Sequence, residues 1–219
     1  MILKHIYLYI HTTEFPDPLV TKFGFQTRYI CNFIERRLKD ELFNAEGFSK
    51  ICVLGRKIAE KQCHVVSENA LVSEVQFDRD RYESLQGEEY HEFFLDMLER
   101  GLIKCQESHS IPLSVLLSAV EEFRSCGYKN RWEHEKMLLI NGFVAKLRCD
   151  LNLSEFVLTL SVHKGDHVLF EQPILKTKPD EIIFAHQFKD MEQSNGELVV
   201  KNKFGKKLYS LRLTDLGVA

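Results

Sequence analysis

Several common signals are missing from this 219-residue sequence. No run of apolar residues approaches the roughly 18 that a membrane-spanning helix needs, so we expect no contact with a membrane. The six cysteines are scattered without a CxxC pair, which favours buried thiols in a reducing compartment. The N-terminus has no basic leader and no small-residue cleavage site, so the sequence predicts a cytoplasmic protein.

The sequence also lacks a strong charge of one sign. It contains 29 Lys and Arg and 32 Asp and Glu, for a formal net charge of -3. Proteins that bind a nucleic acid backbone usually concentrate positive charge, so we expect no direct binding to nucleic acid. The composition, 44% hydrophobic and 28% charged, is typical of a soluble globular protein. The chain is long enough to form a core without metals or disulfides.

The residue patterns of common active sites are missing as well. His91-Glu92 begins like the zinc motif HExxH, but Leu95 stands where the second histidine is needed. His163 and His167 have a ligand-like spacing but no cysteine or carboxylate partners near them in the sequence. Gly55 and the two basic residues after it lack the rest of a phosphate-binding loop. We therefore predict no catalytic residues, no metal and no cofactor.

The two halves of the sequence have different residue patterns. Apolar residues in the first half predict strands at 2–10, 50–58 and 70–77 and amphipathic helices at 26–43, 88–101 and 111–126. From about Lys136, short alternating segments are separated by turn residues such as Asn195-Gly196, which predicts an antiparallel meander. These segments are 136–153, 155–162, 167–175, 181–188, 196–202 and 206–213.

Together, the two residue patterns predict one α+β domain over residues 1–219. It is rich in helices over 1–130 and forms a β-meander over 136–213. In this interpretation the N-terminal strands and amphipathic helices pack on a mostly antiparallel C-terminal sheet. Pro173 should lie at a strand edge or end, because proline cannot donate to a β-ladder.

The first candidate binding surface is an acidic row in "EEYHEFFLDMLERGL", residues 88–102. Glu88, Glu92, Asp96 and Glu99 share one face of the predicted helix, opposite an apolar stripe. No lysine follows at i+4 to neutralise them, so a basic partner could relieve their mutual repulsion. The alternative is that the row is an ordinary solvated helix face.

The second candidate surface is "GYKNRWEHE", residues 127–135. Tyr128, Arg131 and Trp132 belong to the residue types most enriched at interface hot spots. The alternative is that Trp132 packs over the edge of the core while Arg131 is merely exposed.

The arrangement of the chain resembles the immunity proteins of bacterial contact-dependent inhibition and related polymorphic toxin systems. The resemblance lies in "LERGLIKC", "IPLSVLLSAVEEFRSCGYKNRWEHEKM" and "LFEQPILKTKPDEIIF". It implies a small cytoplasmic protein, not an enzyme, that binds a cognate toxin domain and blocks it. Many such toxins are nucleases with basic substrate grooves, which the acidic row could match. The alternatives are a small hydrolase and a protein-interaction adaptor, and the sequence leaves the oligomeric state open.

Overall fold

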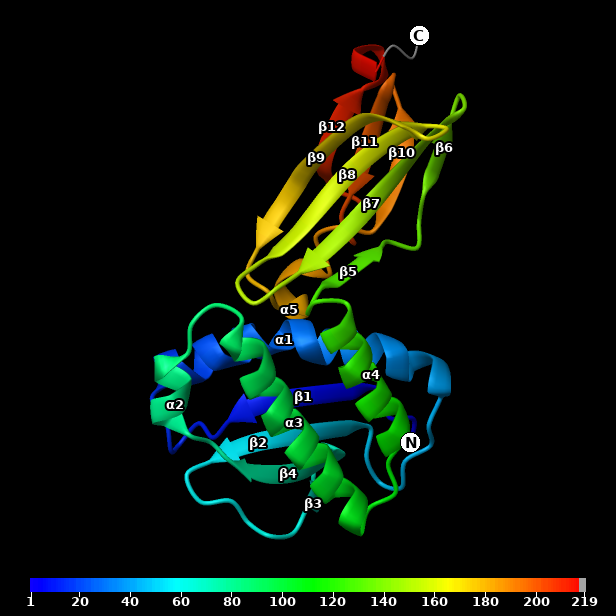
Figure 1. Ribbon diagram of the computed structural model, residues 1–219. Coiled ribbons are helices and arrows are strands. Elements are labelled where there is room, and N and C mark those ends of the chain that lie inside the picture. The colour runs from blue at the N-terminus through cyan, green and yellow to red at the C-terminus, as the bar shows by residue number, and fades with distance from the viewer. Residues whose placement is uncertain (217–219) are drawn as a thin grey trace. The chain divides into compact units, whose positions relative to one another are not determined.

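The computed structural model describes residues 1–216 (Figure 1). Its contacts divide the chain into two compact units, Met1–Asn130 and Arg131–Ala219, where the sequence predicted one domain. We call these unit 1 and unit 2 and describe each by itself. The change in residue pattern that the sequence shows near Lys136 lies close to this division. Among the described residues, no helix is both long and apolar enough to span a bilayer.

Unit 1 contains a four-stranded sheet with the order β1-β2-β4-β3. Strands β1 (His5–Ile10), β2 (Lys50–Arg56) and β4 (Ala70–Gln76) are parallel, and the short β3 (His64–Val66) pairs antiparallel with β4. The three strands expected in this half are therefore confirmed. Burial alternates along β1 and β2, so only one face of the sheet belongs to the core.

The helices of unit 1 differ at their ends from the sequence-based ranges. The structure contains α1 (Asp17–Leu38), the short η1 (Lys39–Glu41), α2 (Arg79–Ser84), α3 (Glu89–Ser108) and α4 (Leu113–Ser125). Helix α1 begins earlier than expected, because Pro18 lies in its first turn, where a missing N–H is tolerated. Pro112 is the N-cap of α4, while Gly127 follows its end with a φ of 68°.

Gly101 does not end α3, contrary to the prediction. A Cβ at Gly101 would lie 2.5 Å from both methyl carbons of Val53, which is on β2. Glycine is therefore needed here for the close approach of helix and strand, and the helix continues for two more turns. Ser73 Oγ donates to the Gly101 carbonyl at 2.9 Å across the same contact.

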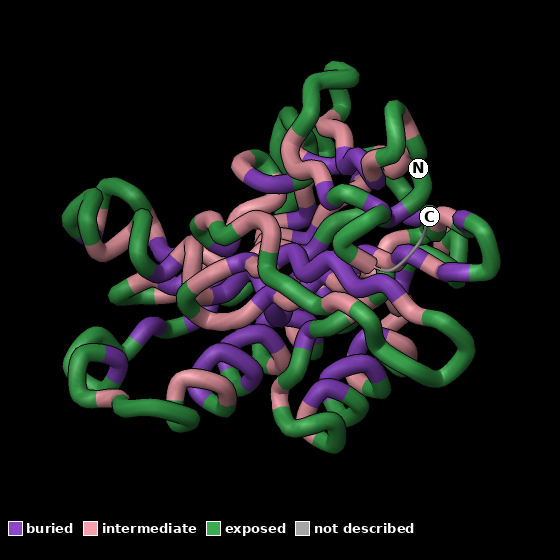
Figure 2. The backbone as a smooth tube through the Cα atoms, turned by 90° about the horizontal axis from the view of Figure 1, so that it is seen from above, coloured by how far each residue is buried: buried purple, intermediate pink, exposed green. Residues whose placement is uncertain are grey.

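Helices α1 and α3 pack on the sheet of unit 1, and α4 packs on these two helices. Helix α1 packs against β1 and α4, and α3 packs against β2, β4 and α4. Figure 2 shows helical segments that are buried along one side and exposed along the other. We expected these helices to cover the C-terminal sheet; the structure instead packs them on the N-terminal sheet.

Helix α1 also covers the outer edge of β1. Thr27 Oγ1 donates to the Leu8 carbonyl at 2.9 Å, and Arg28 Nη1 donates to the Ile6 carbonyl at 3.2 Å. The Ile6 N–H donates to Glu35 Oε1 at 2.9 Å. These side chains satisfy backbone groups that an edge strand otherwise leaves open to pairing.

Unit 2 is built from antiparallel strands in two sheets, with the orders β5-β7-β8-β9 and β10-β11-β12; β6 also pairs with β7. The strands are β5 (Asn130–Glu133), β6 (Leu138–Ile140), β7 (Phe143–Leu151), β8 (Phe156–Lys164), β9 (His167–Thr177), β10 (Asp190–Ser194), β11 (Glu197–Lys201) and β12 (Lys207–Arg212), followed by η2 (Leu213–Leu216). The α+β class and the antiparallel C-terminal sheets are thus confirmed. Pro173 lies in the edge strand β9, as predicted.

One segment of unit 2 differs from its prediction. Residues 181–188 were expected to form a strand, but Glu181–Phe184 form the short helix α5. The Asp180 side chain accepts from the Ile182 N–H at 2.8 Å and caps this turn. Phe184 then stacks on Phe156 with ring centroids 3.8 Å apart, and Phe188 lies 5.6 Å from the same ring. The apolar residues at the start of the segment therefore belong to a helical turn and not to a strand.

Candidate partner-binding surface

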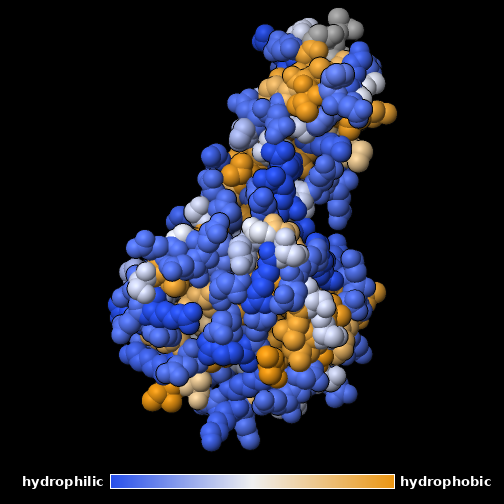
Figure 3. Space-filling view, viewed as in Figure 1, coloured by the Kyte–Doolittle hydropathy of each residue, from blue (hydrophilic) through white to orange (hydrophobic). Residues whose placement is uncertain are grey.

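The acidic row lies at the start and along the outer side of α3. Glu88 is the N-cap of the helix, and Glu92 and Asp96 are exposed. The opposite side of α3 is buried, as the apolar stripe predicted, and contains Phe93, Phe94, Met97 and Leu98. Hydrophilic side chains cover most of unit 1 over α3 and α4, with apolar side chains gathered beside them (Figure 3). The row is therefore on the surface of unit 1.

Arg124 of α4 binds two carboxylates of the row. Its Nε lies 3.1 Å from Glu92 Oε1, and its Nη2 lies 2.8 Å from Glu99 Oε2. Nη1 also binds Glu121 Oε1, one turn earlier on α4, at 2.5 Å. These hydrogen bonds lower the pKa of Glu92 and raise that of Arg124. We call Glu92, Glu99, Glu121 and Arg124 the Arg124 cluster.

The premise that the row has no neutralising partner is wrong for three of its four members. Besides the two carboxylates on Arg124, Asp96 pairs with Arg100 one turn along α3, at 3.0 Å. Arginine at this spacing neutralises a carboxylate as lysine does, and Arg100 follows Asp96 by four residues. The partner on α4 follows Glu92 by 32 residues, so no local pattern reveals it. Glu88 remains an exposed carboxylate at the helix start.

Tyr128 joins the acidic row, so part of the second predicted surface lies beside the first. Its hydroxyl donates to Glu92 Oε1 at 2.8 Å, and its ring stacks on His91 with centroids 4.4 Å apart. The backbone of Tyr128 has a φ of 58°, which is uncommon for a residue with a side chain. Neighbouring contacts thus hold the phenol against the carboxylate.

His91 connects this surface to the core of unit 1. Its Nδ1 is hydrogen bonded to the hydroxyl of Tyr29, a buried residue of α1. Burial lowers the pKa of His91, and the neighbouring carboxylates of Glu88 and Glu92 oppose that shift. Burial also raises the pKa of Tyr29, so this hydroxyl keeps its proton in the hydrogen bond with His91.

Arg131 and Trp132 belong to unit 2, whereas Tyr128 belongs to unit 1. Arg131 Nε pairs with Asp150 Oδ2 at 2.6 Å. The Trp132 ring is half-buried, with its centroid 6.2 Å from that of Phe156. Within unit 2, these contacts are consistent with the alternative interpretation, in which Trp132 packs over the edge of the core.

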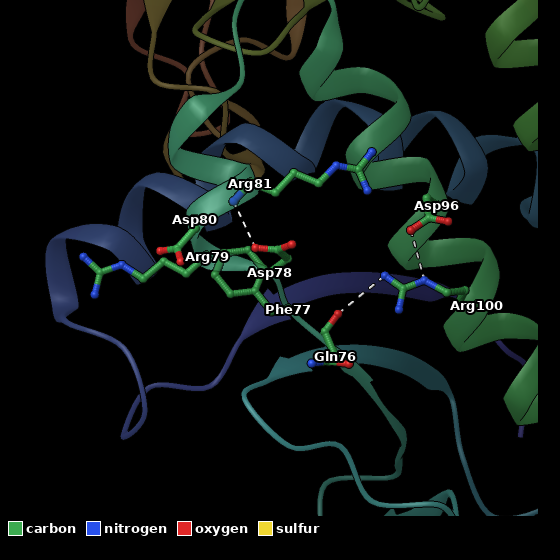
Figure 4. A pocket seen from close by; sticks show the side chains of 8 residues that line it. All are labelled: Gln76, Phe77, Asp78, Arg79, Asp80, Arg81, Asp96 and Arg100. Carbon is green, nitrogen blue, oxygen red and sulfur yellow. Dashed lines mark hydrogen bonds and ion pairs between the residues drawn. The ribbon is translucent and has the colours of Figure 1, made fainter.

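Sequence reasoning missed a polar pocket of about 550 Å³ at the end of β4 (Figure 4). It is lined by Gln76, Phe77, Asp78, Arg79, Asp80, Arg81, Asp96 and Arg100. In open sheets with parallel strands, ligands often bind at this end of the strands. The run of alternating Asp and Arg after the third strand was the available signal.

The charges of this pocket are largely used within the protein. Arg100 binds Asp96 and lies 3.5 Å from the Gln76 carbonyl. Asp78 accepts from the Arg81 N–H at 2.9 Å, which caps α2, and Arg79 pairs with Glu83 at 2.7 Å. No histidine, cysteine or serine lines the pocket. These pairings can orient a polar ligand.

Metal-ligating residues do not gather in the part of the chain that the structure describes, where no group of three His, Cys, Asp or Glu could hold an ion. His163 Nε2 lies 2.9 Å from Ser161 Oγ.

Comparisons with protein-family models, with curated proteins and with solved structures found no match for this chain.

Proposed function

We propose that this protein is an immunity protein that binds a cognate toxin domain and neutralises it without catalysis, in the cytoplasm. The observation that carries the proposal is the Arg124 cluster, in which three carboxylates from two helices share one guanidinium. The cluster therefore keeps more negative than positive charge, and Glu88 adds another carboxylate nearby. Such a surface suits a basic partner.

The rigidity of the cluster strengthens this argument. A flexible carboxylate loses side-chain entropy when a partner immobilises it, and this loss weakens binding. Glu92 is already held by Arg124 and Tyr128, so less freedom remains to be lost. Tyr128 adds an aromatic residue of the type enriched at hot spots, next to the acidic groups.

The resemblance to immunity proteins gives the partner a class. A toxin with nuclease activity needs a basic groove for the phosphates of its substrate. A fixed group of carboxylates can bind such a groove through its negative charge, as the phosphates do. None of the six cysteines forms a disulfide, and the thiols of Cys31, Cys63, Cys105 and Cys149 are buried. Free buried thiols are consistent with the reducing cytoplasm.

Charge reversal at the edge of the cluster tests the proposal. Glu88→Lys with Glu121→Lys changes two exposed carboxylates while leaving the bonds of Arg124 to Glu92 and Glu99 in place. We expect association with the toxin domain encoded beside this gene to slow by about tenfold or more at low salt. The loss should shrink as salt rises, because salt screens exposed charges.

The matched control is Glu46→Lys with Glu68→Lys, two exposed glutamates of unit 1 outside α3 and α4 that change the net charge equally. It should leave the association rate close to that of the unchanged protein. Stopped-flow kinetics and protection of toxin-producing cells are the two measurements. Equal slowing by both double variants would reduce the effect to net charge and remove the role of this surface.

A further inference from the structure

A second surface lies in unit 2, where the turn between β11 and β12 meets α5. Phe204 of this turn is 70% exposed and Ile182 of α5 is 85% exposed, although burial of both would release free energy. Apolar side chains that gather at the surface beside charged ones often mark an interaction site. We call Ile182, Lys203, Phe204 and Lys206 the Phe204 tip. All four belong to unit 2, so the tip is separate from the Arg124 cluster.

Contacts of His186 connect the two parts of the tip. The centroid of its ring lies 6.2 Å from that of Phe204, and its carbonyl accepts from the Lys203 N–H at 2.9 Å. Ile182 precedes His186 by four residues, and its carbonyl lies 3.2 Å from His186 Nδ1. Residues with this spacing share one side of a helical turn. The two exposed apolar residues therefore belong to one surface, with His186 between them.

The turn that presents Phe204 is ordered by Asn202. The Oδ1 of Asn202 accepts from the N–H groups of Phe204 and Lys206, both at 2.9 Å. The Asn202 N–H also donates to the Lys206 carbonyl at 2.9 Å, and Gly205 has a φ of 75°, which glycine adopts without strain. A partner that binds the exposed ring therefore does not have to order the turn.

The lysines around this turn differ in their partners. Lys201 and Lys207 pair with glutamates of neighbouring strands, at 2.6 Å and 3.3 Å, so their charges are neutralised within the protein. In the part of the chain that the structure describes, Lys203 and Lys206 pair with no carboxylate. Two unpaired positive charges therefore flank the exposed ring of Phe204.

From these observations we infer that the Phe204 tip binds the surface of a bilayer that contains anionic lipids. Phe204 and Ile182 enter the boundary between head groups and acyl chains, and Lys203 and Lys206 pair with the lipid phosphates. The contact is peripheral and needs no spanning helix, unlike the membrane contact that the sequence argument considered.

The combination of side chains selects this partner over other anions. A nucleic acid would use the Phe204 ring for base stacking, but Ile182 has no ring on which a base could stack. An acidic protein would need a pocket shaped to cover each protruding apolar side chain. A bilayer accepts both side chains without a matching pocket, while its phosphates attract the lysines.

Flotation of the full chain with lipid vesicles tests the inference. The vesicles consist of phosphatidylglycerol or of phosphatidylcholine, at millimolar lipid, because two lysines and two apolar side chains give weak, reversible binding. At low salt we expect affinity for phosphatidylglycerol to be about tenfold higher or more, and to fall as salt rises. Equal binding to both vesicles, or binding to neither, would overturn the inference. Binding to single-stranded DNA but to neither vesicle would assign the tip to nucleic acid instead.

Lysine variants test the charged part of the contact. Lys203→Gln with Lys206→Gln should weaken binding to phosphatidylglycerol about tenfold. The matched control is Lys61→Gln with Lys129→Gln, which removes two exposed lysines of unit 1 and changes the net charge equally. It should leave the affinity close to that of the unchanged protein. Equal losses in the two double variants would reduce the effect to net charge and overturn the assignment to the tip.

Apolar variants test insertion. Ile182→Ser with Phe204→Ser should weaken binding to phosphatidylglycerol, whereas Leu139→Ser with Val168→Ser, exposed apolar residues elsewhere in unit 2, should not. Phe204→Trp keeps a large aromatic ring at the tip and gives a readout in a protein that still binds. Its emission should move to shorter wavelength on phosphatidylglycerol vesicles, against the baseline of Trp132 in the unchanged protein. Unmoved emission at saturating lipid would contradict insertion of the tip.

Discussion

Unit 1 and unit 2 bury their sheets in different ways. In unit 1, helices pack on a mostly parallel sheet, and the bonds that fix them join distant residues, such as Ser73 Oγ to the Gly101 carbonyl at 2.9 Å. In unit 2, the pairs β7–β8, β8–β9, β10–β11 and β11–β12 all join consecutive strands. The comparison teaches that local sequence patterns describe unit 2 well, whereas unit 1 depends on contacts that no local pattern contains.

The largest predicted effect tests whether the two units are stabilised independently. Phe156→Ala removes a fully buried ring that stacks with Phe184 and Phe188, and such a loss lowers the free energy of unfolding by about 3–5 kcal/mol. Trp132, the only tryptophan, reports on unit 2, and the far-UV circular dichroism of α1, α3 and α4 reports on unit 1. In urea unfolding, we expect the tryptophan transition alone to move to lower concentration. An equal shift of both signals would mean that the units unfold together.

The next effect concerns the helix–sheet contact of unit 1. Gly101→Ala places a Cβ 2.5 Å from the methyl carbons of Val53, and this overpacking should reduce stability by about 1–3 kcal/mol. The control is Gly24→Ala in α1, whose Cβ would meet only ordinary contacts at 3.7 Å from Tyr9. There alanine should gain up to about 1 kcal/mol from helix propensity. Thermal unfolding followed by circular dichroism measures both, and opposite signs are expected.

A smaller effect separates the Arg124 cluster from an ordinary surface ion pair. Arg124→Gln leaves Glu92, Glu99 and Glu121 without their shared cation, and we expect a loss of about 1 kcal/mol. Arg79→Gln, which breaks one exposed i,i+4 pair with Glu83, should cost no more than about 0.5 kcal/mol. High salt should narrow the difference between the two variants. Equal losses in urea unfolding would show that the cluster has no special strength.

The same contrast explains which sequence-based predictions succeeded. Turn residues such as Asn195-Gly196, with φ values of 50° and 75°, connect neighbouring strands, so the hairpins of unit 2 follow from a few adjacent residues. The alternation in β2 has a less obvious origin, because parallel strands are usually buried on both faces. Here the helices cover one face only, and the pattern "KICVLGR" alternates like an antiparallel strand. The sequence therefore did not reveal which sheet the helices cover.

The candidate surface illustrates the same limit. Local spacing placed Glu92 and Asp96 on the outer side of a helix, and this was correct. Their partners could be foreseen only in part: Arg100 lies one turn away, whereas Arg124 and Tyr128 come from a later helix and the loop after it. That Glu92 and Tyr128 share one surface follows from the packing of α4 on α3, which sequence spacing does not specify.

The smallest predicted effect concerns the pH dependence of unit 1 through His91. Burial lowers the pKa of His91 below its unfolded value of 6.5, so the unfolded chain binds a proton more readily than the folded one. Stability from this group is present above about pH 6.5 and declines as pH falls through the folded pKa. His91→Phe retains an aromatic ring against Tyr128 but removes both the titration and the hydrogen bond to Tyr29. The variant should be less stable at neutral pH, and its circular dichroism midpoint should vary less between about pH 7 and about pH 5.

The control is His134→Phe, which removes a histidine of unit 2 whose pKa is also lowered by burial. In this variant only the midpoint of the tryptophan signal should depend less on pH. Glu92 titrates at lower pH, because Arg124 lowers its pKa from 4.5, so it does not confuse this window. If the unfolding midpoint of His91→Phe changes with pH as steeply as that of the unchanged protein, folding does not lower the pKa of His91. The hydrogen bond from His91 to Tyr29 would then be absent.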